Sequence, residues 1–307
     1  MNRLIIVCNS ARVTLFLSRF APLNIEYVKD IYPYIGKEGV YVVSCGRGIH
    51  AYQDTSQPPK EFSSYVENFI GLTNNPFVDS TSRIGNDVSS TENKRALYVS
   101  RGSWMHGLQT RMPLVEKRFE VFRTLFSLDV SPWKKQGEQV VYFSPNPHGY
   151  WRNWNEHVLH NWVSKDIDQL QKIRRCTSKP IVVKHHPSTP LHFSHQYAQT
   201  VKHAISNLEV DICNSVDTVL KQAHCSIVNH GSSCVLSCMK GIPVIYDNDH
   251  ESCIPIRNIG VRGYHCIDHI FDQQLPNQLR FLDYIASQTI LLSQNDAAMI
   301  GKIFTKE

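Results

Sequence analysis

Two apolar runs, each followed at once by polar residues, constrain the fold of this chain most strongly. The first, Ile181-Val182-Val183-Lys184, is rich in β-branched residues and stops at His185-His186-Pro187. The second, 225–228, runs into Asn229-His230-Gly231-Ser232-Ser233, and another apolar run follows at 242–245. Short β-branched runs bounded by Pro and Gly are typical of buried strands. The spacing therefore predicts strand–loop–helix units along one sheet.

The segment 234–240 has the length and the punctuation of a short helix. Ser232 or Ser233 can cap its start, and Gly241 supplies a residue with positive φ just past its end. The start of such a helix presents unpaired backbone N–H groups and the positive end of the helix dipole. An anion is favoured there, so we expect a site for a diphosphate.

The order of these motifs resembles the donor half of GT-B glycosyltransferases, which use nucleotide sugars. The resemblance rests on Lys184-His185-His186-Pro187 and on Gly241-Ile242-Pro243-Val244-Ile245. It narrows to a group of phage-encoded glycosyltransferases, several of which modify hydroxymethylated bases in phage DNA. The narrower resemblance is carried by Ser131-Pro132-Trp133, Gly137, 140–143, Gly149-Tyr150-Trp151, the helix with Trp162, 177–187 and 280–289. Those enzymes usually have Arg-x-His-Pro or Lys-Pro-His-Pro at the first motif and a Trp where Thr289 stands, so the choice of sugar stays open.

Length and composition agree with a two-domain protein. The 307 residues suit two domains, and 42% hydrophobic with 19% charged residues is ordinary for a globular chain. No apolar run reaches the ~18 residues that span a bilayer. The nine cysteines are an odd number without tight spacing, and the sequence has no Asn-x-Ser/Thr site. These features favour a reducing cytoplasm, that of the host cell if the chain is viral, and we expect a monomer without membrane contact.

Strands alternate with helices along the whole chain. Apolar runs predict strands at 4–8, 40–45, 96–100 and 139–143, and helical spacing predicts helices at 13–20 and 113–128. The residues at 73–93 are polar and lack periodicity, so we expect a long loop there. The alternation predicts an α/β fold of two Rossmann-like domains with mainly parallel sheets.

The boundary between the domains is expected near Ser131, because Pro132 breaks the preceding helical pattern. We assign 1–131 to an acceptor-binding domain and 132–279 to a domain that binds the nucleotide-sugar donor. The GT-B resemblance implies that the two domains face a central cleft and that a C-terminal helix crosses back to the first domain. The near-helical apolar spacing of 277–302 makes it the candidate for this helix, and about 280–307 would complete the first domain.

Ligands of open α/β sheets bind beyond the carboxyl ends of the strands, which directs attention to four loops of the second domain. Polar side chains in these loops can meet phosphate or accept hydrogen bonds from sugar hydroxyls. The donor-binding candidates are Ser144, His148, Gly149, Arg152, Lys184, His185, His186, Asn229, His230, Gly231, Ser232, Ser233 and Asp247. Any one of these histidines alone is more often a satisfied, partly buried residue, so the prediction rests on the four loops together.

Positive charge is concentrated between Lys94 and Arg123. Seven basic and two acidic residues in this segment give a local excess of +5, equal to the formal net charge of the whole chain. Tyr98, Trp104, Phe119 and Phe122 are interleaved with the charges, as in surfaces that bind a phosphate backbone and exposed bases. The candidate contacts with a DNA acceptor are Arg47, Arg101, Trp104, Arg111, Lys117 and Arg118. The alternative is a solvated helix at 113–128 with its aromatic residues in the core.

Two metal-dependent alternatives have weaker support. Asp247-Asn248-Asp249 matches the Asp-x-Asp metal motif of the other major glycosyltransferase fold, but two fixed letters occur often by chance. Cys234 and Cys238 lie one helical turn apart without a Cys-x-x-Cys pair, which favours buried thiols over a zinc site. We therefore expect no obligatory metal or cofactor. Phosphate-loop, Gly-x-Gly-x-x-Gly and Gly-x-Ser-x-Gly motifs are also absent from the sequence.

The function expected from these features is transfer of a hexose or pentose from a nucleoside diphosphate sugar to a hydroxyl. The expected nucleotide of the donor is UDP. An inverting enzyme would need a base beside the acceptor hydroxyl, and His50, Asp79 and Asp87 are the candidates. The first acceptor hypothesis is double-stranded phage DNA with hydroxymethylated pyrimidines such as hydroxymethylcytosine. The alternatives are a transferase acting on cell-surface or capsular glycan, a nucleotide-sugar epimerase of the same fold, and a nucleic-acid-binding protein without catalysis.

Overall fold

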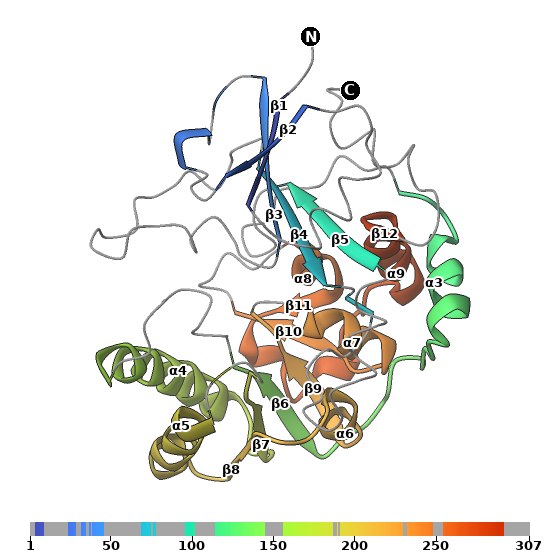
Figure 1. Ribbon diagram of the computed structural model, residues 1–307. Coiled ribbons are helices and arrows are strands. Elements are labelled where there is room, and N and C mark those ends of the chain that lie inside the picture. The colour runs from blue at the N-terminus through green and yellow to red at the C-terminus, as the bar shows by residue number, and fades with distance from the viewer. Residues whose placement is uncertain are drawn as a thin grey trace. The chain divides into compact units, whose positions relative to one another are not determined.

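Two six-stranded sheets organise the structure (Figure 1). The computed structural model describes residues 4–8, 24–28, 32–34, 37, 39–45, 69–74, 76–77, 96–101, 114–144, 156–186, 189, 191–229, 232–247 and 254–291. The chain divides into two compact units. Unit 1 comprises Met1–Val78, Asp87–Ser127 and Leu282–Glu307, and unit 2 comprises Asp79–Asn86 and Leu128–Phe281.

The sheet of unit 1 has the strand order β12-β5-β4-β3-β1-β2. Its strands are β1 (Leu4–Cys8), β2 (Asn24–Val28), β3 (Val40–Cys45), β4 (Phe69–Asn74), β5 (Ala96–Arg101) and β12 (Thr289–Leu291). The pairs among β1, β2, β3 and β4 are parallel, whereas β5 is antiparallel to both β4 and β12. A short 3-10 helix, η1 (Tyr32–Tyr34), lies between β2 and β3 in the chain.

The sheet of unit 2 is parallel throughout and has the order β11-β10-β9-β6-β7-β8. Its strands are β6 (Gln139–Phe143), β7 (Ile181–Lys184), β8 (Leu208–Asp211), β9 (Ala223–Ile227), β10 (Val244–Tyr246) and β11 (Gly260–Arg262). Every residue of β7 and β9 is buried, as expected for central strands covered on both faces.

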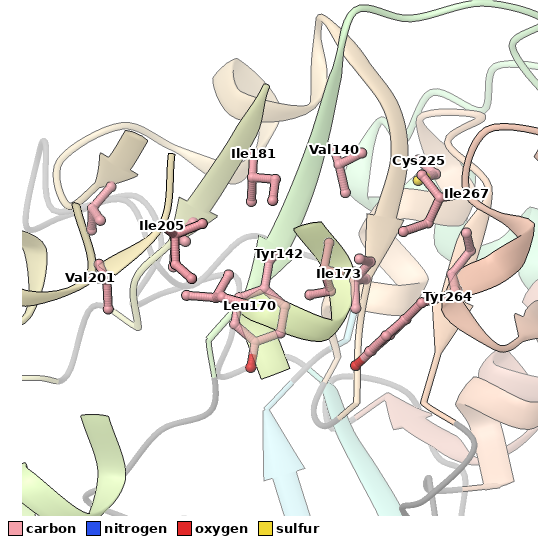
Figure 2. Close-up of a cluster of buried hydrophobic side chains, with 14 of the residues drawn as sticks. Val140, Tyr142, Leu170, Ile173, Ile181, Val201, Ile205, Cys225, Tyr264 and Ile267 are labelled. Carbon is pink, nitrogen blue, oxygen red and sulfur yellow. The ribbon is translucent and has the colours of Figure 1, made fainter. Parts of the chain in front are cut away.

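Helices cover both faces of this parallel sheet. They are α4 (Glu156–Cys176), α5 (Leu191–Ala204), α6 (Val216–Leu220), α7 (Ser233–Met239) and α8 (Ile254–Ile259), with the 3-10 turns η4 (Tyr264–Cys266) and η5 (Ile270–Asp272). Alternate strand residues such as Val140 and Tyr142 form one core cluster with apolar residues of α4 and α5 (Figure 2). None of the buried residues of α6 and α7 belongs to that cluster, and both helices contact the sheet strands separately. The alternation of strand side chains thus supplies two cores, one on each face.

The predicted α/β class with two mainly parallel sheets is confirmed. The strands expected at 4–8, 40–45 and 181–184 have the predicted bounds, and β10 begins at Val244, just after Pro243. The predicted helix at 113–128 is shorter, because α3 spans Arg118–Phe126. The helix expected at 13–20 and most of the loop expected at 73–93 lie outside the described residues.

The prediction of one helix over 277–302 is wrong at residues 289–291, and residues 292–302 lie outside the described part of the chain. Helix α9 spans Gln278–Ser287, and Thr289–Leu291 forms β12, which pairs antiparallel with β5. The helix begins in unit 2 and ends in unit 1. Within unit 1, the Asp283 carboxylate of α9 accepts hydrogen bonds from the backbone N–H groups of Lys117 (3.0 Å) and Phe119 (2.9 Å). Asp283 therefore satisfies the unpaired N–H groups at the start of α3.

Candidate functional site

Polar residues directly follow four strands of the parallel sheet of unit 2. Ser144 follows β6, His185 follows β7, Asn229 lies two residues past β9, and Asp247 follows β10. All four are buried, with exposed fractions between 1% and 5%. Because parallel strands end at the same edge of a sheet, these residues line the carboxyl edge, the usual ligand edge of an open α/β sheet. The structure thus brings together one donor-binding candidate from each of the four predicted loops.

Asn229 and Asp247 belong to one hydrogen-bonded group, which we name the Asn229 network. The Asn229 side chain accepts a hydrogen bond from the Asp247 backbone N–H (2.9 Å) and donates one to the Tyr264 hydroxyl (3.1 Å). Tyr264 in turn donates to the Gln169 side chain of α4 (3.1 Å). Burial raises the pKa of the Tyr264 hydroxyl, so it stays protonated and keeps donating. This group fixes the backbone at the end of β10, where Asp247 lies.

A second buried group surrounds Asp166 of α4. Its Oδ1 accepts a hydrogen bond from the Tyr142 hydroxyl, and its Oδ2 accepts from the Ser144 hydroxyl (3.0 Å) and the Tyr197 hydroxyl (2.5 Å). Burial raises the pKa of the Asp166 carboxyl, although the three hydrogen bonds oppose this effect. The hydroxyls of Tyr142 and Tyr264 lie on the same side of the core cluster (Figure 2).

His185 lies in a stack of three parallel rings. Its imidazole is 4.7 Å from the Tyr197 ring centroid and 5.2 Å from that of Trp162, with interplanar angles of 15° and 10°. Trp162 and Tyr197 also stack on each other at 4.9 Å. The ring of His185 is almost completely buried, whereas the neighbouring His186 is partly exposed. His186 is therefore the more accessible member of this predicted pair.

Lys184, predicted to meet phosphate, is buried and paired. Its ammonium lies 3.2 Å from the Asp211 carboxylate, and the two side chains are 3% and 9% exposed. The partners stand opposite each other in the β7–β8 register. Asn214 also donates two hydrogen bonds to Asp211. A phosphate would have to displace the Asp211 carboxylate from the Lys184 ammonium. In the structure, Lys184 therefore joins β7 to β8.

The predicted phosphate helix, α7, is short. It spans seven residues, and Ser232 is its N-cap residue, as predicted, although its side chain makes no capping hydrogen bond. Ser232 is exposed and Ser233 is partly exposed. Gly241 has φ +68° just past the helix, as predicted. The helix therefore offers backbone N–H groups and two serine hydroxyls at its start, but a dipole of only two turns.

The other donor and catalytic candidates lie outside the described residues: His148, Gly149, Arg152, His230, Gly231, His50, Asp79 and Asp87. The same holds for the acceptor candidates Arg47, Trp104 and Arg111 and for the side chain of Arg101.

The described part of the basic segment consists of β5, residues 114–117 and the start of α3, an amphipathic helix with an aromatic core face. Phe119 and Phe122 of α3 are buried, and both rings lie about 5 Å from the ring of Phe77. Lys117 is exposed, and the Arg118 guanidinium lies 5.4 Å from the centroid of the Phe122 ring. The aromatic residues of α3 therefore lie in the core, as in the alternative, and whether its exposed basic residues contact DNA stays a prediction.

Sequence reasoning missed the residues that hold the strand ends in place: Trp162, Asp166, Gln169, Tyr197 and Tyr264. One signal was available for Asp166. It occupies a position on the apolar stripe of α4, between Val163 and Leu170, where a charge is unexpected. Tyr197 and Tyr264 carry no such signal, because tyrosine is ordinary in a core.

Among the residues that the structure describes, no group of three or more His, Cys, Asp or Glu side chains is placed to hold a metal ion. None of the described helices combines the length and the apolar character needed to cross a bilayer.

No protein-family model and no curated protein matches the chain. Solved structures do. The Thermosulfurimonas dismutans KpsC β-Kdo 2,7-transferase has a TM-score of 0.51 at 11% identity, and the match covers 98% of both chains. The fold is that of GT-B glycosyltransferases. The β-Kdo 2,4-transferase of the same KpsC matches with a TM-score of 0.48 at 11% identity, over 93% of this chain and 90% of that one. The wall teichoic acid polymerase TagF matches with a TM-score of 0.30 at 13% identity, over 98% and 88%. The narrower resemblance to phage DNA glycosyltransferases stays a prediction.

Proposed function

We propose that this protein is a glycosyltransferase that moves a sugar from a nucleoside diphosphate sugar to an acceptor hydroxyl. The observation that carries the proposal is the carboxyl edge of the parallel sheet in unit 2, where Ser144, His185, Asn229 and Asp247 follow four different strands. Nucleotide ligands of open α/β sheets bind at this edge. A hexose or a pentose linked to UDP is the donor we would test first.

The chemistry follows from charge development at the donor. The bond between the anomeric carbon and the diphosphate breaks, and negative charge grows on the diphosphate oxygens. Backbone N–H groups at Ser232 and Ser233, together with Arg152, would stabilise this charge. Lys184 is left out because its ammonium is bonded to Asp211. In an inverting reaction, the acceptor hydroxyl attacks and a base removes its proton, for which His50 and Asp87 remain our candidates.

For the acceptor we favour a hydroxyl of a cell-surface glycan. The β-Kdo 2,7-transferase has a similar fold over almost the whole of both chains, which supports this choice by analogy only. In addition, Phe119 and Phe122 lie in the core of unit 1, so two of the aromatic residues expected to meet exposed bases are committed elsewhere. A glycan acceptor does not need a basic groove.

Hydroxymethylated DNA is the second candidate acceptor. It is favoured by one observation, the excess of five positive charges between Lys94 and Arg123. A phosphate backbone attracts such a segment, and the 5-hydroxymethyl group of a modified pyrimidine is a suitable nucleophile. The enzyme would act in the cytoplasm, inside a host cell if the chain is viral.

A panel of nucleotide sugars tests both parts of the proposal. The chain is incubated with UDP-linked and other labelled donors and with lipid-linked glycan, hydroxymethylated DNA or plain DNA. Label in the glycan alone supports the favoured acceptor, label in hydroxymethylated DNA alone supports the second, and no transfer from any donor overturns the proposal.

A double variant tests the position of the donor. Ser232→Ala with Ser233→Ala should raise the donor KM or lower kcat about tenfold, since each hydroxyl can bond a diphosphate oxygen. The matched control is Ser164→Ala with Ser206→Ala, two exposed serines of the same unit. Equal kinetics in the two double variants would contradict the placement of the diphosphate at α7.

A further inference from the structure

Asp166 is a buried carboxylate that the proposed chemistry does not use. It is 2% exposed and lies on α4, inside the core of unit 2. Its three hydrogen-bond donors come from β6, from the residue after β6 and from α5. A buried carboxylate is tolerated only where donors replace its lost water, and three hydroxyls supply that replacement.

The two carboxylate oxygens have different partners. Oδ1 accepts from Tyr142 of β6. Oδ2 accepts from Ser144, the residue at the end of β6, and from Tyr197. The ring of Tyr197 stacks on His185, the residue at the end of β7, with 4.7 Å between centroids. Through Oδ2, Asp166 is thus connected to two strand ends of the candidate donor site.

We infer that Asp166 is a positioning residue of the donor site, which holds Ser144 directly and His185 through the ring of Tyr197. The inference rests on the proposed function. The donor would then meet two strand ends whose relative placement is set before it binds, which lowers the cost of binding.

The structure offers a matched pair of variants. Tyr142→Phe and Tyr197→Phe each remove one buried hydroxyl that donates to Asp166, and each leaves the aromatic ring in the core. Of these two tyrosines, Tyr197 is the one that stacks on His185. The positioning role predicts that Tyr197→Phe and Ser144→Ala raise the donor KM roughly tenfold, with kcat changed less, while Tyr142→Phe leaves KM within about twofold. If Asp166 serves stability alone, both tyrosine variants lower the melting temperature and change KM alike.

A second measurement does not depend on turnover. With ¹³C-labelled histidine, the imidazole resonance of His185, assigned with the His185→Asn variant, should shift or broaden in Tyr197→Phe and Asp166→Asn and stay in place in Tyr142→Phe. No change in any variant, or equal changes in both tyrosine variants, would overturn the positioning role.

The two proposals fail in different ways. Absence of transfer and of nucleotide binding in the wild type refutes the proposed function, and the imidazole resonance then still decides whether Asp166 holds His185. A wild type that binds and transfers, with parallel KM changes in both tyrosine variants, refutes the positioning role alone.

Discussion

Gly241 gives the sharpest prediction about the stability of unit 2. It has φ +68°, and a Cβ placed on it would lie 2.0 Å from the carbonyl oxygen of Pro132 and 3.0 Å from that of Ser131. These backbone atoms are held in place, because the Ser131 N–H donates to Met239 O and the Lys134 N–H donates to Gly241 O, both at 2.8 Å. We expect Gly241→Ala to destabilise the unit strongly.

The magnitude is the sum of three terms. The left-handed conformation costs an alanine about 1–2 kcal/mol, and displacement of a packed backbone costs about 1–3 kcal/mol. Alanine also lowers the conformational entropy of the unfolded chain, which offsets about 0.4–1 kcal/mol of this cost. The free energy of unfolding should therefore fall by about 2–4 kcal/mol, which lowers the melting temperature by roughly 6–12 °C for a domain of this size.

Two other glycines separate these terms. Gly39 has φ +76°, and a Cβ added there would have nothing within 4 Å, so Gly39→Ala carries the conformational cost alone. At Gly137, where φ is not in the left-handed range, a Cβ would lie 2.3 Å from the carbonyl oxygen of Ala223, so Gly137→Ala carries the steric cost alone. Differential scanning calorimetry of the three variants checks the sum. If Gly241→Ala is no less stable than Gly39→Ala, the reasoning about contact with Pro132 is refuted.

Three further predictions concern charge. Lys184→Met should lower the free energy of unfolding by about 3 kcal/mol, because Asp211 stays buried without its cation, and urea denaturation should show partial recovery when Asp211→Leu is added. If no metal is obligatory, transferase activity should survive a chelator, and complete loss restored only by manganese or magnesium would contradict this. If the acceptor is DNA, exchanging Arg111, Lys117 and Arg118 for Gln should reduce the slope of log affinity against log salt by up to roughly three units; equal shallow slopes for variant and wild type would favour the glycan.

Seven of the described strands were predicted because their signal is local, whereas β2, β4, β8, β11 and β12 were not predicted. The run at 181–184 is β-branched and ends at polar residues, and β7 has those bounds. The end of α9 was not predictable in the same way. Ile290 and Leu291 continue an apolar pattern that fits a helix, but they belong to β12, whose partner β5 lies far away in the chain. The pairing of β12 with β5 is a tertiary interaction, and it overrides the local periodicity.

The number of charges in the basic segment does not determine where its side chains lie. Cations and aromatic residues alternate in its sequence, and both a DNA-binding groove and a solvated amphipathic helix have this pattern. In the structure, Phe119 and Phe122 face the core while Lys117 and Arg123 are exposed, and Asp283 binds the start of α3. An amphipathic helix produces this alternation without any ligand. Charge alone therefore could not distinguish a DNA groove from a solvated helix.

In the candidate site, the positions of the residues follow from local sequence patterns, whereas the contacts of their side chains depend on tertiary packing. Strand ends can be read from the sequence, so Ser144, His185, Asn229 and Asp247 lie at one sheet edge as expected, and their role in donor binding stays a prediction. What their side chains contact depends on α4, whose position on the sheet is set by packing. Burial of a charge without hydrogen-bond partners costs too much free energy. Asp166, within an apolar helical stripe, is therefore a sequence signal for buried hydrogen-bond donors around α4. In this chain, that charge lies where the core is joined to the strand ends, through the hydrogen bonds of Asp166 with Ser144 and Tyr197.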